Sequence, residues 1–167
     1  MNHQLSEQQL DSIRQFRLPE YREIPNVGLY LDQSAKFINE YLKVLPGRGI
    51  TLSMIANYVK MKLIDNPIRR QYYRPQIAEL IFISLTKGVI SLEDIRKLLQ
   101  LAREQDLEAI YNRFARQFES SLRQVFGLEE NKLPEAAESS IINDVITAVV
   151  HAIHVEECCR ALTDQPQ

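Results

Sequence analysis

Residues 43–74 read KVLPGRGITLSMIANYVKMKLIDNPIRRQYYR, and this stretch decides the predicted fold. The Pro-Gly-Arg-Gly break at 46–49 ends one helix, and Thr51 is a good N-cap for a second helix predicted over 52–63. An Asn-Pro pair stops that helix. The short aromatic run at 68–73 is typical of a strand or a hairpin arm. The stretch therefore predicts two helices joined by a turn and followed by a small β wing.

The same stretch is strongly basic. It holds seven Lys or Arg residues against one acidic residue, a net charge of +6, whereas the whole chain carries −2. Residues 101–167 have the opposite balance, six basic against twelve acidic residues, or −6. Charge of one sign gathered on one segment is typical of a surface that binds phosphates. We therefore expect nucleic-acid contacts from the N-terminal part of the chain and a different role for the C-terminal part.

Helical periodicity dominates the rest of the sequence. Good N-caps stand at Ser6, Asp32, Ser91 and Asp106, each before apolar residues at steps of three and four. These signals predict helices over 6–16, 32–45, 75–86, 91–104 and 106–126, and a last helix from Pro134 to about Leu162. Because ten of the fifteen residues at 141–155 are aliphatic, we expect that last helix to be buried on nearly all sides, either at the centre of a bundle or at a subunit interface. The predicted fold class is all-α with a small β wing.

Composition narrows the class of protein. A hydrophobic content of 45% and a charged content of 25% are typical of a globular chain. No apolar run is long enough for a membrane span, and the polar N-terminus does not have the layout of a signal peptide. The adjacent Cys158 and Cys159 make no disulfide framework. We therefore expect a cytoplasmic protein with no membrane partner.

Catalytic motifs are missing from the sequence. It contains no glycine-rich phosphate loop, no G-x-S-x-G and no H-E-x-x-H. We therefore expect neither an enzyme nor a cofactor.

The second helix of the basic stretch carries candidate base-reading residues. Its buried stripe is predicted to consist of Leu52, Ile55, Val59 and Leu63. That stripe leaves six side chains outward or at its edges, namely Ser53, Met54, Asn57, Tyr58, Lys60 and Met61. Asn can read adenine, and Ser and Tyr suit phosphates. The alternative is that this face is merely solvated, as on any helix pair.

The predicted wing adds arginines beside aromatic rings. Arg69, Arg70 and Arg74 surround Tyr72 and Tyr73, a combination that suits contact with phosphates and sugars. The alternative is a solvated charge run with two tyrosines in the core. Because helix, wing and charge agree, we favour the DNA-binding interpretation.

These residues carry a resemblance to a known family. TLSMIANYVKMKLI at 51–64 resembles the second helix of MerR-family winged-helix regulators, and Arg70-Gln71-Tyr72 is similar to that family's Arg-x-Tyr wing. GVISLEDI at 88–95 resembles the start of its following helix. Ala56 and Lys62 stand where the family has an arginine and a glycine. The segment LPEYREIPNVGLYLDQ at 18–33 is also similar to an uncharacterised bacterial family of about this length.

The resemblance implies a sequence-specific regulator of transcription that binds double-stranded DNA as a homodimer. It implies a MerR-like winged helix-turn-helix domain at 1–99, with an N-terminal extension, and a helical dimerisation or effector region at 100–167. The expected DNA contacts are Thr51, Ser53, Met54, Asn57, Tyr58, Lys60, Lys62, Arg69, Arg70, Tyr72, Tyr73 and Arg74.

Two other functions remain open at this point. The basic face could bind an acidic partner, which would make the chain a helical interaction adaptor. His151, His154 and Cys158 lie within reach of one helical face, and imidazole with thiolate suits Zn²⁺ or Cu(I), as in a metal or redox sensor. The alternative for these three residues is a pair of core-edge histidines and a buried thiol.

Overall fold

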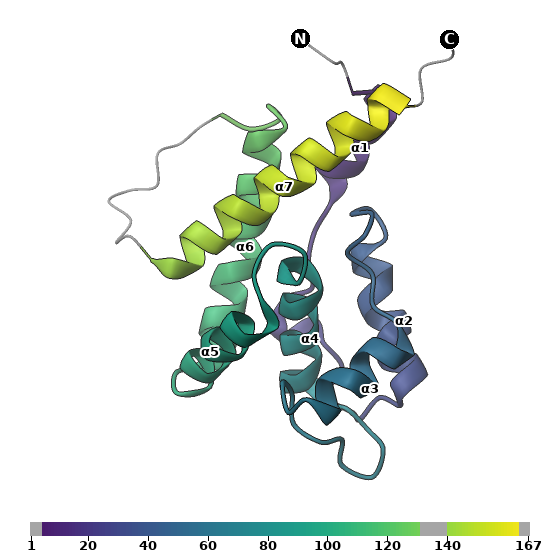
Figure 1. Ribbon diagram of the computed structural model, residues 1–167, viewed down its shortest axis with the longest axis vertical. Coiled ribbons are helices and arrows are strands. Elements are labelled where there is room, and N and C mark those ends of the chain that lie inside the picture. The colour runs from purple at the N-terminus through teal and green to yellow at the C-terminus, as the bar shows by residue number, and fades with distance from the viewer. Residues whose placement is uncertain (1–4, 131–139, 164–167) are drawn as a thin grey trace. The chain divides into compact units, whose positions relative to one another are not determined.

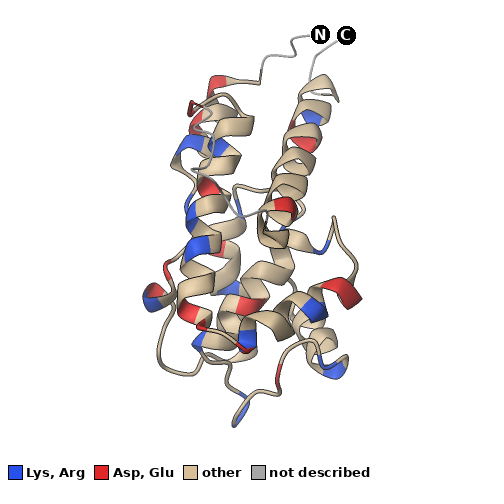
Figure 2. Cartoon of the chain, turned by 90° about the vertical axis from the view of Figure 1, so that its left-hand side faces the viewer, with Lys and Arg blue, Asp and Glu red and all other residues tan. Residues whose placement is uncertain are grey.

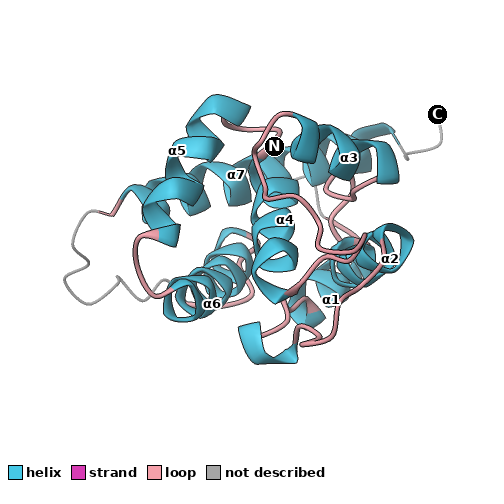
Figure 3. Ribbon diagram, turned by 90° about the horizontal axis from the view of Figure 1, so that it is seen from below, coloured by secondary structure: helices cyan, strands magenta, loops and turns pink. Residues whose placement is uncertain are grey.

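The computed structural model describes residues 5–130 and 140–163. In these ranges the regular elements are helices: α1 (Glu7–Gln15), η1 (Tyr21–Glu23), α2 (Leu31–Leu42), α3 (Leu52–Lys60), α4 (Arg74–Thr86), α5 (Leu92–Arg103), α6 (Leu107–Val125) and α7 (Ile141–Thr163). Figure 3 shows these helices joined by loops. The predicted all-α class is confirmed. The predicted start of the last helix at Pro134 lies outside the described residues.

Most helix starts follow the predicted caps. The hydroxyls of Ser6, Thr51 and Ser91 each accept the backbone N–H three residues later, at 3.2, 3.2 and 3.1 Å. Asp32 is not a cap, because α2 begins at Leu31 after Tyr30. Its carboxylate lies instead in the first turn, where it is favourable beside the positive end of the helix dipole.

The chain divides into two compact units. We call residues 18–115 the core unit, and residues 1–17 with 116–167 the terminal unit. The boundary expected from the sequence after residue 99 lies inside α5, whereas the units divide at 17/18 and within α6 at 115/116.

The core unit is built around α4. Every residue of α4 from Gln76 to Thr86 is buried, and α4 contacts both α2 and α5 (Figure 1). The rings of Phe82 and Phe114 meet edge to face, with centroids 5.2 Å apart, which adds the start of α6 to this core. A helix buried all round must satisfy its polar side chains internally, as Gln76 does with the loop after α3 and Glu79 does with Arg103 of α5.

The terminal unit contains α1, the second half of α6 and α7. Phe16 and Phe118 pack edge to face at 6.1 Å, and Phe126 packs in the same way on the ring of His154 at 4.9 Å. Within one chain α7 is not buried on all sides, because Ile141 and Val155 are more than half exposed. Its other side, which includes Val149, is buried.

Candidate nucleic-acid interface

The connection between α2 and α3 is held by one amide. Asn39 Oδ1 accepts the N–H of Ile50, and Asn39 Nδ2 donates to the Ile50 carbonyl, both at 2.8 Å. Gly47 has a φ of +74° and follows Pro46, as in a tight turn that needs glycine at its third position. The start of α3 is therefore fixed relative to α2.

The end of α3 is fixed by a left-handed residue. Lys62 has a φ of +56°, its N–H donates to Val59, and the N–H of Leu63 donates to Tyr58, each at 2.9 Å. This is the Schellman arrangement, in which glycine is the usual left-handed residue. Lys62 thus has the backbone conformation that glycine would adopt at the position where the resembled family carries one.

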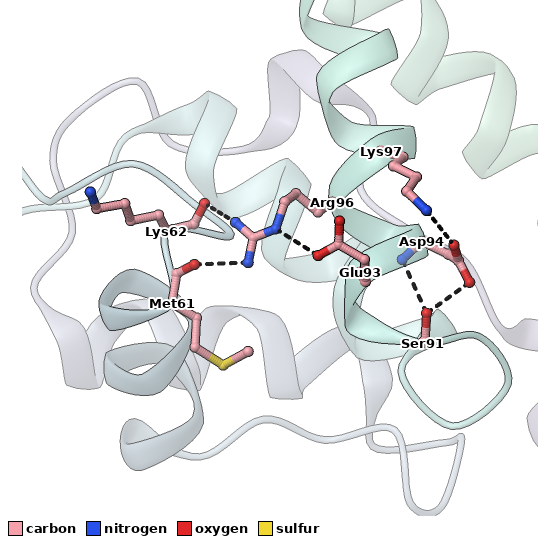
Figure 4. Close-up of polar contacts among 7 residues, drawn as sticks. All are labelled: Met61, Lys62, Ser91, Glu93, Asp94, Arg96 and Lys97. Carbon is pink, nitrogen blue, oxygen red and sulfur yellow. Dashed lines mark hydrogen bonds and ion pairs between the residues drawn. The ribbon is translucent and has the colours of Figure 1, made fainter.

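An arginine from α5 also holds this end of α3. Arg96 donates to the carbonyl oxygens of Met61 at 2.8 Å and Lys62 at 2.7 Å, and pairs with Glu93 at 3.4 Å (Figure 4). A guanidinium at a helix C-terminus also compensates the negative end of the helix dipole. Local sequence patterns could not predict this role, because Arg96 lies 34 residues from Lys62 in the chain.

Figure 4 also shows how the neighbouring cation of α5 is paired. Lys97 forms an ion pair with Asp94 at 3.2 Å. Hydrogen bonds from Ser91 and from Lys97 lower the pKa of the Asp94 carboxyl. The charge of Lys97 is therefore paired with Asp94 in the first turn of α5.

The loop between α3 and α4 is closed by one buried side chain. Gln76 Nε2 donates to the carbonyl oxygens of Asp65 at 3.0 Å and Asn66 at 3.1 Å, and Gln76 Oε1 accepts the N–H of Tyr73 at 2.8 Å. One amide from α4 therefore holds both ends of the loop.

The tip of this loop is a two-residue turn. Ile68 and Gln71 exchange backbone hydrogen bonds of 3.0 and 2.9 Å around Arg69 and Arg70, whose φ angles are +51° and +66°. Turns with two positive φ angles normally carry Asn-Gly, because other residues are strained by roughly 1 kcal/mol or more each. The structure thus has a hairpin-like turn where the sequence predicted an arm. Its backbone pairing consists of isolated bridges, of which the second joins Leu29 to Tyr72.

Seven of the twelve predicted contacts are exposed. They are Thr51, Ser53, Asn57, Lys60, Lys62, Arg69 and Arg70. Met54, Tyr73 and Arg74 are partly buried.

Tyr58 and Tyr72 are buried, so their expected place on the binding surface is wrong. Burial raises the pKa of both phenols. Leu52, predicted in the buried stripe, is 46% exposed. The reason is rotational: the buried face of α3 centres on Ile55 and Tyr58, and Leu63 joins the core only after the helix has ended.

Arg74 is occupied by structural contacts. Its guanidinium donates to the carbonyl oxygens of Ile24 at 2.7 Å and Arg22 at 3.2 Å, and it lies 5.7 Å from the centre of the Tyr21 ring. Arg74 therefore ties the segment before α2 to the start of α4. Periodicity could not reveal this, because the partners are backbone carbonyls distant in sequence.

Four cations of the basic stretch stay exposed and unpaired within the part of the chain that the structure describes. We call Lys60, Lys62, Arg69 and Arg70 the basic quartet. The loop after α3 extends below α2, α3 and α4 in Figure 1, and its tip is blue in Figure 2. By contrast, Lys43 pairs with Glu40 at 2.9 Å, and Arg48 is only 4% exposed.

The exposed face of α3 completes the surface. Ser53, Ala56, Asn57 and Lys60 follow at steps of three, one and three, which places them on one side of the helix. Because the side chains of Ser53 and Ala56 are small, a duplex could approach the backbone of α3 closely on this face. Asn57 Nδ2 lies 3.3 Å from the Sδ of Met61, a weak acceptor, so its amide oxygen is available to a ligand.

Neither a metal-binding cluster nor a candidate membrane span is found among the described residues. No group of three or more His, Cys, Asp or Glu in 5–130 and 140–163 is placed to hold a metal ion. His151, His154 and Cys158 are therefore not gathered as a ligand set, and only the Cys158 Sγ and His154 Nε2 atoms approach, at 3.6 Å. No helix in the described part combines the length and apolarity that a bilayer crossing requires.

Comparison with known proteins identifies a family. A family model described as a domain of unknown function, DUF1836, matches residues 19–114. That range nearly coincides with the core unit and excludes α7. No curated protein and no solved structure has a significant match.

Proposed function

We propose that this chain, which belongs to the DUF1836 family of domains of unknown function, is a sequence-specific regulator of transcription whose core unit binds double-stranded DNA. The proposal rests on one observation. The basic quartet leaves four positive charges exposed and unpaired on two neighbouring segments, while other cations of the same stretch are used inside the fold.

Backbone strain supports the same interpretation. Three members of the quartet, Lys62, Arg69 and Arg70, have positive φ angles although none is glycine. Strain of about 1–3 kcal/mol for each such residue persists where the surrounding structure enforces it, and such residues cluster at functional sites. Arginine at both positions of a turn that favours Asn-Gly therefore supports a binding role for these two side chains.

The arrangement suggests how the two segments would share the work. The α3 face would enter the major groove, where Asn57 can read adenine and Ser53 can reach a phosphate. Arg69 and Arg70 would contact the DNA phosphates beside that groove. Lys60 and Lys62 would add phosphate contacts between the α3 face and the turn. A helix followed by an arginine-bearing turn is also what the resemblance to MerR-type winged helices implies.

The test is DNA binding by fluorescence anisotropy at several salt concentrations. We expect steep salt dependence with random duplex DNA. Each of Lys60→Gln, Lys62→Gln, Arg69→Gln and Arg70→Gln should weaken binding and reduce the slope of log K against log salt by about 1. Lys43→Gln and Lys97→Gln are matched controls, because each removes the same charge from a paired, exposed lysine. These controls should leave the slope unchanged.

Two outcomes would overturn the proposal. One is the absence of binding at low salt to both random DNA and DNA from upstream of the chain's own gene. The other is an equal effect of quartet and control variants, which would indicate attraction by net charge alone. In the first case, the quartet would be a surface for an acidic protein partner.

A further inference from the structure

Leu52 is the first residue of α3, and its side chain is 46% exposed. Ala56, one turn later, is also exposed. Residues four apart lie next to each other on a helix, so Leu52 and Ala56 form a continuous apolar surface, which we call the apolar pair. Isolated exposed apolar residues need no explanation, but this pair lies on the helix that we propose enters the major groove.

Polar side chains lie beside the apolar pair on the same exposed half of α3. With about 100° between successive residues, the order around this half, from one edge to the other, is Leu52, Ala56, Lys60, Ser53, Asn57 and Met61. The buried residues Ile55 and Tyr58 lie on the opposite half. The exposed half of α3 therefore has the apolar pair along one edge and Asn57 near the other edge.

The side chains on this half of α3 suit some bases and not others. In the major groove, Arg and Lys suit guanine, Asn and Gln suit adenine, Asp and Glu suit cytosine, and apolar side chains suit the thymine methyl group. The sequence of α3, LSMIANYVK, contains no Arg, Asp, Glu or Gln. Lys60 could pair with guanine, but it is the last residue of α3, and recognition helices contact bases mainly through their N-terminal residues. The exposed residues of the first two turns therefore offer Asn57 to adenine and the apolar pair to thymine.

We propose that α3 reads adjacent A·T pairs, with the apolar pair against the methyl groups of thymines and Asn57 on an adenine. This inference rests on the DNA-binding function proposed above. One turn of a helix rises about 5.4 Å, and successive bases of a strand are about 3.4 Å apart. With α3 along the groove, Leu52 and Ala56 thus span between one and two base steps. The thymines that they contact are therefore neighbours in the duplex.

Charges around the apolar pair favour DNA over an apolar protein surface as its occupant. Lys60 and Lys62 of the basic quartet lie at the C-terminal end of α3. Lys87 lies near the N-terminal end, where its Nζ donates to the Gly49 carbonyl at 2.6 Å. The sequence at 51–64 contains no acidic residue. A polyanion that carries methyl groups in its groove matches both the cations and the apolar pair.

Two duplexes that differ only in a methyl group test this inference. One duplex has alternating A and T, and the other has uracil in place of every thymine, which leaves the phosphate charge and the hydrogen-bonding groups of the bases unchanged. The full chain should bind the thymine duplex about fourfold more tightly for each methyl group that the apolar pair covers, the effect of burying one CH₂-sized group. Fluorescence anisotropy at one salt concentration measures both affinities.

Three variants assign the methyl effect to the apolar pair. Leu52→Ala should bring the ratio of the two affinities towards one, with little change in binding to the uracil duplex. Leu101→Ala is the matched control, because Leu101 is a leucine of α5 with a similar exposed fraction, 49%, and it should keep the full ratio. Asn57→Ala should weaken binding to both duplexes and keep the ratio, since both contain adenine.

The outcomes separate this inference from the proposed function. Equal affinity of the parent chain for the thymine and uracil duplexes would overturn the inference and leave DNA binding standing. A ratio that survives Leu52→Ala, or that Leu101→Ala reduces equally, would also overturn it. The absence of binding to either duplex and to random DNA at low salt would overturn both proposals.

Discussion

Arg69 and Arg70 occupy backbone conformations that favour Asn-Gly, and this gives a test at the scale of single residues. Replacing the pair by Arg69→Asn with Arg70→Gly should raise the free energy of unfolding by about 1–2 kcal/mol, because the left-handed strain is relieved. The same change should weaken DNA binding. Urea denaturation and anisotropy measure the two effects.

Lys62→Gly is the companion to that experiment. It relieves strain at the Schellman position and should likewise stabilise the chain, by about 1 kcal/mol. If neither variant is more stable than the parent chain, the strain at these positions is not significant.

Tyr58 and Tyr72 make stability sensitive to alkaline pH. Burial raises the pKa of both phenols above the ordinary value near 10. Above that value the unfolded chain loses phenolic protons while the folded chain retains them, so the free energy of unfolding falls as pH rises. Tyrosinate absorbance should show part of the seven tyrosines ionising only together with unfolding. Tyr58→Phe should flatten this pH dependence, and an unchanged curve would contradict the explanation.

At the scale of elements, Arg96 couples the end of α3 to α5. Arg96→Met should cost about 1–2 kcal/mol, because the Met61 and Lys62 carbonyls lose charge-assisted donors. Arg96→Lys should restore only part of this, since one ammonium cannot reproduce the fork of the guanidinium. Thermal unfolding measures the difference. Lys97→Met, on the same turn, should be nearly neutral, and an equal loss there would contradict the coupling.

The pair of Glu79 and Arg103 joins α4 to α5. Arg103 contacts the two carboxylate oxygens at 2.6 and 2.9 Å and also donates to the Leu63 carbonyl at 3.1 Å, while Glu79 is 5% exposed. The carboxylate of Glu79 raises the pKa of the Arg103 guanidinium further, so the arginine stays charged.

Arg103→Met should destabilise the chain by about 3–5 kcal/mol, because it leaves a buried carboxylate without a partner. Adding Glu79→Met should recover much of that loss. Urea denaturation of both variants is the measurement, and a double variant as unstable as the single one would exclude the unpaired charge as the cause.

Local signals explain which parts of the elements were predictable. Ser6, Thr51 and Ser91 cap helices through contacts three residues away, so sequence alone identifies them. The buried face of α3 depends on neighbours distant in the chain. It is rotated from the predicted face, so that it keeps Ile55 but contains Tyr58 in place of Leu52. Arg74 was misassigned for the same reason, because nothing in a charge run distinguishes a cation bound to carbonyls from a free one.

At the scale of the whole molecule, charge separates with the two units. The core unit has fourteen basic and eleven acidic residues, a net +3, and the terminal unit has six basic and eleven acidic residues, a net −5. The opposite signs of the two parts were readable from the sequence. The unit boundary was not, because α6 continues through it without a break in periodicity.

The Gln76 amide has a thermodynamic consequence. Because it closes the loop at 65–73 from both ends, the conformational freedom of that loop is lost when the chain folds and not when a ligand arrives. Binding through Arg69 and Arg70 would then order only their side chains. Calorimetry should accordingly find a small heat-capacity change on complex formation, and Gln76→Ala should enlarge it as the loop comes to fold on its target.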